Sequence, residues 1–434
     1  MVRLVGAALL LGLAACGEPE TPGAKRAPPA SKAKPSIVFF LLDAVRADHV
    51  PAYGYTREKM PFLAGLAERG VVYERAYAPS SWTPSSMASI FTGLWVNQHG
   101  VYTGFHATRQ ALRQGTRMKL NRIPEAVPTL PEILARGGYR TFGASGNPNI
   151  DAATGFKRGF GRFSGKDEGG VTGRVAEWKP ELRSGGAPFF LYLHYMDAHD
   201  IGQLKKRPGQ TRDQARREAY DAGLRAVDEK MRFALKTLDL LDGETLVVIT
   251  ADHGEEFLDH GGEGHWNKLY EELVRVPLIL YWPSRLRPAR VAQPVSSIDL
   301  LPTLREAAGL APGADDQGVS LLATLRGEVQ AERSFFPMRW WDATDPRSVR
   351  KAVIHGGAKY IVGLPQGDEE LYDLVADPKE RSNLIQSRPE LAADLRRRLS
   401  AFEAGARVHP REFSEPVEIS KDKAEELKAL GYVQ

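Results

Sequence analysis

The chain has 434 residues, of which 42% are hydrophobic and 26% are charged, so it is long enough for one large globular domain and a smaller second one. Its formal net charge of +4 is small for this length. No basic patch is interleaved with aromatic residues, so we expect no nucleic acid partner. The only cysteine is Cys16, which excludes an internal disulfide and a cysteine-based metal site.

The first segment reads MVRLVGAALLLGLAAC. Arg3 precedes an apolar stretch over residues 4–13, which is too short to span a bilayer and is typical of a signal peptide. Its ending, Leu-Ala-Ala-Cys, resembles the lipobox of bacterial lipoproteins, in which the cysteine is lipidated. We therefore predict a lipoprotein signal peptide over residues 1–16 with Cys16 as the lipidation site. The alternative is an ordinary signal peptide in which Cys16 is incidental.

Residues 17–35 are rich in Pro, Ala and Lys and have no apolar period, which predicts a disordered linker. Anchor and linker together predict a protein of the bacterial cell envelope that is lipid-anchored and faces the periplasm or the exterior. The sequence leaves open which membrane holds the anchor.

Continuous apolar runs and helical patterns alternate after residue 35. The runs, rich in Val, Ile and Phe, predict strands that are buried on both faces over residues 36–42, 139–144, 189–194, 245–250 and 276–281. Apolar residues at helical spacing predict helices over residues 60–69, 129–137 and 212–241. This alternation predicts an α/β fold with a central, mostly parallel sheet flanked by helices, over residues 36–315.

The pattern changes near residue 315. A hairpin with a Gly-Gly turn over residues 351–364 and a helix over residues 388–405 predict a smaller α+β domain at residues 316–434. We expect the segments 101–128 and 164–184 to be loops at the entrance of the site.

Acids and histidines follow several of the predicted strands. Asp43 ends the first strand, and Asp252 and His253 follow the strand at 245–250. The strand at 189–194 runs into the sequence HYMDAH, which contains His194 and His199. Ligands of open α/β sheets bind at the carboxyl ends of the strands, so we expect these side chains to converge.

The segment SSWTPSSMASIFTG predicts a short helix that begins at its Thr-Pro pair. Thr83 is a good N-cap, Pro84 suits the first helical position and Gly93 ends the helix. Two interpretations stay open. Thr83 is either a plain structural cap or a hydroxyl nucleophile at the positive end of a helix, where anions bind.

Asp43, Asp252, His253 and an alkoxide of Thr83 are together a suitable ligand set for one divalent cation. Such an ion lowers the pKa of an oxygen acid that it binds, which turns a poor hydroxyl nucleophile into a good one. The alternative for each aspartate alone is a helix cap after a strand.

The chain resembles the sulfatase-like branch of the alkaline phosphatase superfamily over roughly residues 36–434. The resemblance rests on LLDAVRADHVPAYGY, SSWTPSSMASIFTGL, TADHGEEFLDHGGEGHW, LYEELVRVPLIL, IDLLPTLREAAGL, ELYDLVADPKERSNL and the final ALGYV. It implies an enzyme that acts on an anionic phosphate or sulfate ester with a divalent ion such as Mn, Zn or Ca.

Two departures bear on the chemistry that the resemblance implies. Sulfatases carry a Cys or Ser that becomes formylglycine, whereas Thr83 stands in that slot and Met87 takes the place of the motif's arginine. We therefore expect no formylglycine and a metal-bound threonine nucleophile, as in phosphotransferases and phosphodiesterases of the superfamily. Ala44 stands where many calcium sulfatases have a second aspartate, so we expect four ligands: Asp43, Thr83, Asp252 and His253.

The resemblance also suggests partners for the ester. His199 and His265 are the candidate catalytic acids or oxyanion partners and substrate contacts, with surface loop histidines as the alternative. His194 and Arg46 are weaker substrate-binding candidates, and Arg46 has an ion pair with Asp48 as its alternative. Glu255 and Glu256 either orient His253 or begin a helix.

Three functions follow from these observations. The first is a lipid-anchored metallohydrolase or transferase that cleaves phosphate or sulfate esters through Thr83. The second is a true sulfuric ester hydrolase. The third is a catalytically inactive lipoprotein that binds envelope glycans, which the presence of Asp43, Thr83, Asp252 and His253 disfavours.

Overall fold

The computed structural model describes residues 34–104, 120–165, 170–199, 206–326, 328, 331–340, 348–363 and 367–414. The predicted signal peptide, Cys16 and the linker up to residue 33 lie outside the described residues. Pro35, placed in the linker by the sequence, is buried, and its carbonyl accepts a hydrogen bond from the Tyr139 hydroxyl at 2.9 Å. Pro35 therefore packs against the large domain, whose predicted start at residue 36 stays a prediction. Within the described ranges, no helix combines the length and the apolar character that a membrane crossing requires.

A single eight-stranded sheet forms the centre of the large domain, with the order β13-β2-β12-β8-β1-β7-β5-β6. β1 pairs in parallel with β7 and β8, and β12 pairs antiparallel with β8. The strands are β1 (Ile37–Leu42), β2 (Val71–Tyr73), β5 (Arg140–Ser145), β6 (Arg162–Ser164), β7 (Phe189–Tyr195), β8 (Leu246–Thr250), β12 (Leu278–Tyr281) and β13 (Ala289–Val291). The predicted, mostly parallel sheet is confirmed.

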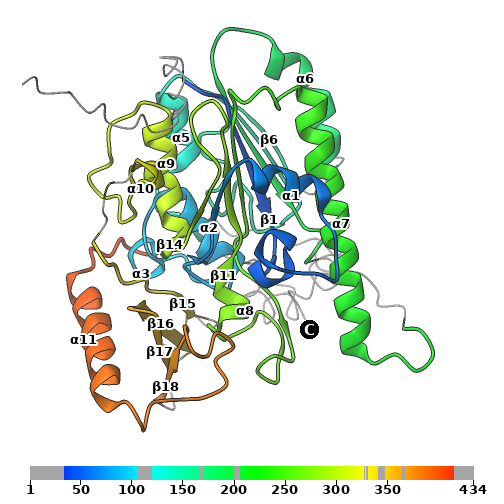
Figure 1. The fold of residues 1–434 in the computed structure, drawn as a ribbon. Coiled ribbons are helices and arrows are strands. Elements are labelled where there is room, and N and C mark those ends of the chain that lie inside the picture. The colour runs from blue at the N-terminus through cyan, green and yellow to red at the C-terminus, as the bar shows by residue number, and fades with distance from the viewer. Residues whose placement is uncertain are drawn as a thin grey trace, which may run out of the picture.

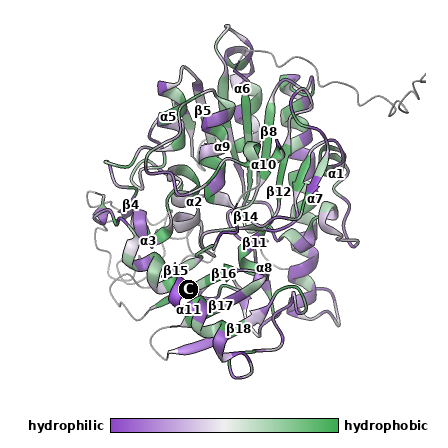
Figure 2. Ribbon diagram, turned by 60° about the vertical axis from the view of Figure 1, so that its left-hand side comes forward, coloured by the Kyte–Doolittle hydropathy of each residue, from purple (hydrophilic) through white to green (hydrophobic). Residues whose placement is uncertain are grey.

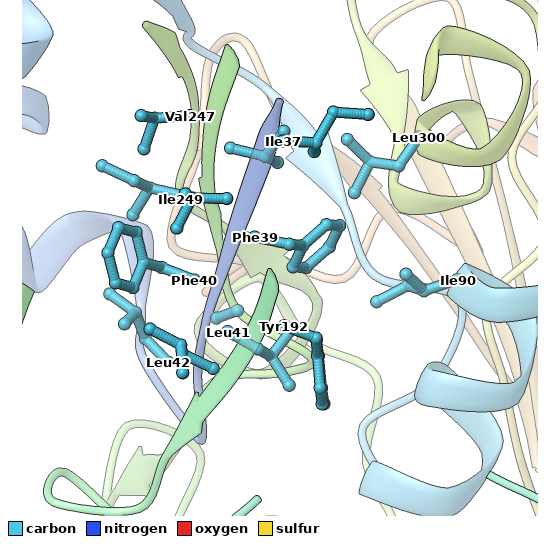
Figure 3. Close-up of a cluster of buried hydrophobic side chains, with 14 of the residues drawn as sticks. Ile37, Phe39, Phe40, Leu41, Leu42, Ile90, Tyr192, Val247, Ile249 and Leu300 are labelled. Carbon is cyan, nitrogen blue, oxygen red and sulfur yellow. The ribbon is translucent and has the colours of Figure 1, made fainter. Parts of the chain in front are cut away.

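Helices cover both faces of this sheet (Figure 1). One layer contains α1 (Pro61–Glu68), α6 (Val171–Arg183) and α7 (Arg212–Leu238). The other contains α2 (Thr83–Thr92), α5 (Leu130–Arg136) and α9 (Leu300–Ala307). Every residue of β1 is fully buried because side chains on both faces of the strand meet a helix layer. Figure 3 shows Phe39 directed toward Ile90 of α2, while Phe40 points to the opposite side of the strand.

The segment 164–184 is not the loop that the sequence analysis expects. It contains the end of β6 and the whole of α6. The apolar pattern explains this helix. Its buried residues recur every three or four positions and so lie along one face: Val171, Val175, Trp178 and Leu182. Of the other predicted entrance loop, residues 105–119 lie outside the described residues.

The C-terminal domain is a four-stranded antiparallel sheet with one long helix, which matches the predicted α+β unit (Figure 2). Its elements are β15 (Met338–Trp340), β16 (Val349–His355), β17 (Ala358–Gly363), β18 (Asp368–Asp373) and α11 (Pro389–Gly405). The β16–β17 hairpin turns at Gly356 and Gly357, whose φ angles of 58° and 78° explain the need for glycine there.

Several short elements complete the described fold. They are the strands β3 (Ala76–Tyr77), β4 (Asn121–Arg122), β9 (Glu256–Phe257), β10 (Glu263–Gly264), β11 (Arg275–Val276), β14 (Val295–Ser296) and β19 (Glu412–Phe413). The short helices are η1 (Ala47–His49), η2 (Pro51–Tyr53), α3 (Val96–His99), α8 (Glu271–Val274), η4 (Ser297–Asp299) and α10 (Leu321–Leu325). The exact boundary between the two domains stays a prediction.

A buried ion cluster joins β17 to α8. The ammonium of Lys359 lies 2.8 Å from Glu271 Oε1 and 3.0 Å from Glu380 Oε1, and the Lys359 side chain is completely buried. Burial raises the pKa of Glu380 to about 7, and Glu271 adds to this effect, whereas Lys359 opposes it. The lysine therefore stabilises two buried carboxylates at the contact between the domains.

We expect Lys359→Met to lower the free energy of unfolding by about 3–5 kcal/mol, because it leaves these carboxylates without their cation. Lys351→Met is the matched control, since Lys351 pairs with Glu403 on the more exposed part of the same sheet and should cost less than about 1 kcal/mol. Thermal and denaturant unfolding of both variants measures the difference. Equal losses in the two variants would contradict the assignment.

Candidate functional site

The site lies at one edge of the main sheet, where four neighbouring strands end. Asp43 follows β1, Asp252 and His253 follow β8, and His194 lies near the end of β7. β5 lies next to β7, and Asn147 follows it. Since β8, β1, β7 and β5 are neighbours and the pairings among them are parallel, their carboxyl ends deliver these side chains to one place.

Thr83 occupies the first position of α2, and Trp82 is the N-cap residue. The predicted capping role of Thr83 is therefore wrong by one position. The Thr83 hydroxyl instead lies 3.1 Å from His253 Nε2, and the amide of Asn147 lies 3.5 Å from it. His253 Nδ1 lies 2.8 Å from the carbonyl of Gly254, which fixes the tautomer with a lone pair on Nε2. The threonine is thus directed into the cluster at the positive end of a helix.

The ligand atoms of Asp43, Asp252 and His253 lie within 4.8 Å of one another, and all three residues are fully buried. Asp43 Oδ1 and Asp252 Oδ2 accept no hydrogen bond. Burial raises the pKa of Asp252, and the neighbouring Asp43 carboxylate raises it further. Two buried acids with unbonded oxygens, a hydroxyl and an imidazole lone pair fit a divalent cation. The individual ligand assignments stay predictions.

Two side chains orient Asp43. His194 Nε2 and the amide of Asn147 lie 2.8 Å and 2.7 Å from Asp43 Oδ2, which leaves Oδ1 for the cluster. The other ring nitrogen of His194 lies 2.8 Å from the Tyr192 hydroxyl, and His194 is fully buried. Both ring nitrogens of His194 are therefore engaged behind Asp43, which disfavours the predicted contact of His194 with substrate.

Sequence reasoning missed Asn147. It follows β5, so the same rule that selected Asp43 and Asp252 could have identified it from its position after an apolar strand.

Arg46 is held by two acids and a backbone carbonyl. Its guanidinium forms ion pairs with Asp48 at 2.8 Å and with Asp259 at 2.7 Å, and it donates to the carbonyl of Glu255 at 3.1 Å. The Arg46 side chain is only 5% exposed, and its N–H groups donate to these acids and to this carbonyl. The alternative ion pair of Arg46 with Asp48 is present, and substrate binding by Arg46 stays a prediction.

His199 and His265 both lie beside the cluster. The rings of His265 and His253 are 4.3 Å apart, and those of His265 and His199 are 5.2 Å apart, measured between centroids. Burial and repulsion by His253 lower the pKa of His265 to about 4, although Glu255 opposes this. The structure thus brings both predicted histidines next to Thr83 and its neighbours.

Glu255 orients His265 and not His253. Glu255 Oε2 lies 2.8 Å from His265 Nδ1, and Arg216 donates to Glu255 Oε1 at 2.9 Å. Glu256 belongs to the short strand β9, so neither of these acids begins a helix. A neutral His265 that donates through Nδ1 keeps Nε2 as its available nitrogen.

We expect Glu255→Gln to lower kcat/KM roughly 10- to 100-fold, the range typical of hydrogen-bond partners that orient histidines of a site. Glu263→Gln is the matched control. Glu263 also pairs with Arg216, at 2.7 Å, but the carboxylate that His265 contacts is that of Glu255. Steady-state kinetics of both variants with a single ester measure the effect, and equal kcat/KM in the two variants would contradict the positioning role.

Known proteins share this architecture. The sulfatase family model matches residues 35–310, and the model of the C-terminal part of N-sulphoglucosamine sulphohydrolase matches residues 261–404. A Δ4,5-hexuronate-2-O-sulfatase of Bacteroides thetaiotaomicron is 24% identical, over 87% of this chain and 88% of its own length.

Solved structures agree in fold. A 2-O GAG sulfatase superimposes with a TM-score of 0.70 at 21% identity, over 86% of this chain and 92% of its own. The phosphonate monoester hydrolase of Agrobacterium radiobacter superimposes with a TM-score of 0.68 at 17% identity, over 85% of this chain and 95% of its own. Because the sulfatase model spans most of the chain, this protein belongs to the sulfatase family of ester hydrolases, within the alkaline phosphatase superfamily.

Proposed function

We propose that this protein hydrolyses a sulfate ester with Thr83 as its nucleophile and one divalent ion held by Asp43, Thr83, Asp252 and His253. The observation that carries the proposal is the placement of the Thr83 hydroxyl, 3.1 Å from His253 Nε2 and beside acids whose outer oxygens have no hydrogen bond. The divalent ion would lower the pKa of the Thr83 hydroxyl and offset the charge of the bound ester.

The side chains of this chain supply the remaining steps. The Thr83 hydroxyl gives its proton to His199 or to Nε2 of the neutral His265 as its oxygen attacks sulfur, and the bond from sulfur to the ester oxygen breaks. The leaving alcohol takes that proton back from the same histidine; the His265 ring lies 4.3 Å from that of His253 and 5.2 Å from that of His199. Water then attacks sulfur, sulfate departs and Thr83 recovers its proton. The positive end of α2 favours the anionic ester throughout.

A phosphate ester is the second candidate, and Thr83 is the observation that favours it. A threonine ester of phosphate is released by ordinary attack of water or of an acceptor alcohol, whereas sulfatases in general use formylglycine. The structural likeness to a phosphonate monoester hydrolase is compatible with this candidate but shows only the fold. An inactive glycan-binding protein is the remaining alternative.

Turnover rates of a sulfate ester and of a phosphate diester, measured with the same protein, test the proposal. The full-length protein in detergent is offered an aryl sulfate and an aryl phosphodiester, each with and without Mn²⁺, Zn²⁺ or Ca²⁺. Metal-dependent cleavage of the sulfate supports the first candidate, and cleavage of the phosphodiester alone replaces it with the second. Stoichiometric metal binding without turnover of either ester favours the inactive protein.

The location of the protein is part of the proposal. Cys16 after an apolar signal segment supports lipid anchoring in a bacterial envelope, with the catalytic domain in the periplasm or outside the cell. Labelling with a radioactive fatty acid tests this. We expect label in the wild-type protein and none in Cys16→Ala, whereas equal label in both would exclude Cys16 as the anchor.

A further inference from the structure

Arg339 of β15 brings a buried cation from the C-terminal domain to the edge of the site. Its guanidinium carbon lies 4.5 Å from the centroid of the Trp82 ring, and its Nε donates to the carbonyl of Trp266 at 2.8 Å. Trp82 immediately precedes Thr83, and Trp266 immediately follows His265. Arg339 therefore contacts the direct neighbours of both the proposed nucleophile and one of its histidine partners.

This arginine has no anionic partner in the part of the chain that the structure describes. It is 1% exposed, and burial alone lowers its pKa to about 9. Among the described residues, its guanidinium also donates a hydrogen bond of 2.5 Å to the carbonyl of Trp340. The residue opposite it on β16 is another cation, Arg350.

Other buried arginines of this protein differ in this respect. Arg46 pairs with Asp48 and Asp259, and Arg216 pairs with Glu255 and Glu263. A charge that is buried without a counterion costs several kcal/mol, as a general rule. An anionic ligand would complete the pairing of such a charge, and a guanidinium suits the paired oxygens of a carboxylate or sulfate.

We propose that Arg339 binds a second anionic group, a carboxylate or a further sulfate, on the alcohol part of the substrate. The inference rests on the proposed function and narrows it, since the preferred substrate is then an ester whose alcohol carries its own negative charge. Arg339 is a specificity-determining residue in this assignment. The planar Trp82 ring beneath the guanidinium fixes its orientation.

The test compares 4-nitrophenyl sulfate with the same ester carrying a carboxylate on its ring. For the wild-type protein we expect the carboxylated ester to have roughly 10- to 100-fold higher kcat/KM, mainly through a lower KM, as a charge-assisted hydrogen bond provides. Arg339→Gln should abolish this preference and change the turnover of the plain ester little. Arg339→Lys keeps a charge without the planar fork and should retain part of the preference.

Arg350→Gln is the matched control, because it removes the same charge from the facing position of β16. It should leave the ratio of the two kcat/KM values unchanged. A purely structural role of Arg339 predicts that Arg339→Gln lowers both values by the same factor, and that result would overturn the proposal. Each variant is compared with the wild type through the ratio of kcat/KM for the two esters, so the different reactivity of the two leaving groups cancels.

Failure of the proposed function gives a different result. If the wild-type protein cleaves neither ester, calorimetry with the carboxylated nitrophenol alone still measures the Arg339 site. Binding to the wild type that is lost in Arg339→Gln supports the second anion site without catalysis. Equal binding or no binding in both proteins contradicts it.

Discussion

We expect Thr83→Ala to abolish turnover of the preferred ester, with kcat at least about a thousandfold lower, because loss of the proposed nucleophile should cost as much as it does in serine hydrolases. Thr83→Ser should retain measurable activity because the hydroxyl stays 3.1 Å from His253 Nε2 in the same helical position. Steady-state and single-turnover kinetics measure both effects, and intact-protein mass spectrometry of the wild type should show Thr83 unmodified.

Thr92→Ala is the control for this experiment. Thr92 lies at the opposite end of the same helix, and its hydroxyl donates to the carbonyl of Ala88 within the helix. Its removal should cost a small amount of stability and leave kcat unchanged. Full activity of Thr83→Ala would show that another oxygen, such as that of water, attacks the ester.

We expect Asp252→Asn to abolish binding of the proposed divalent ion while it preserves the fold. Asp252 Oδ1 accepts the backbone N–H groups of Ala44 at 3.2 Å and of His253 at 3.0 Å, and an asparagine oxygen can accept both. The substitution therefore changes mainly Oδ2, which has no hydrogen bond. We expect stoichiometric metal in the wild type, at least about a hundredfold weaker metal affinity in the variant, and a parallel loss of activity.

The metal-free proteins provide an independent check of this assignment. Since Asp43 disfavours the charged form of Asp252, the neutral asparagine relieves repulsion. Metal-free Asp252→Asn should therefore unfold at the same temperature as the metal-free wild type or at a higher one.

Asp228→Asn is the control, because Asp228 accepts backbone N–H groups of Phe62 and Leu63 with its two oxygens. It should lose about 1–3 kcal/mol of stability and keep the metal. Metal content by mass spectrometry and thermal unfolding separate the two roles. Retention of the ion by Asp252→Asn would falsify the proposed ligand set.

The sequence by itself determined the architecture because its strongest signals are local. β1, β7 and β8 are continuous apolar runs of Val, Ile, Leu and aromatic residues, which only a strand covered on both faces can bury. Their positions, together with the rule that ligands gather at the carboxyl ends of strands, predicted that Asp43 and Asp252 converge, and the structure brings them together. The missed helix α6 also has a local signal, since its buried residues are spaced by four, three and four positions. Its mean hydropathy is low, however, which weakens that signal.

The tertiary structure alone decided which polar side chains face the cluster. Arg46 lies three residues after Asp43, yet its side chain pairs with Asp259. His194 lies near the end of a strand next to β1, yet its ring lies behind Asp43. Only one residue separates Glu255 from His253 in the sequence, yet Glu255 orients His265, which lies ten residues further along the chain. Arg339 comes from another domain, and its lack of a counterion among the described residues became visible only after β15 was packed against Trp82. Side-chain direction and pairing depend on contacts between residues far apart in sequence, and periodicity and spacing carry no information about such contacts.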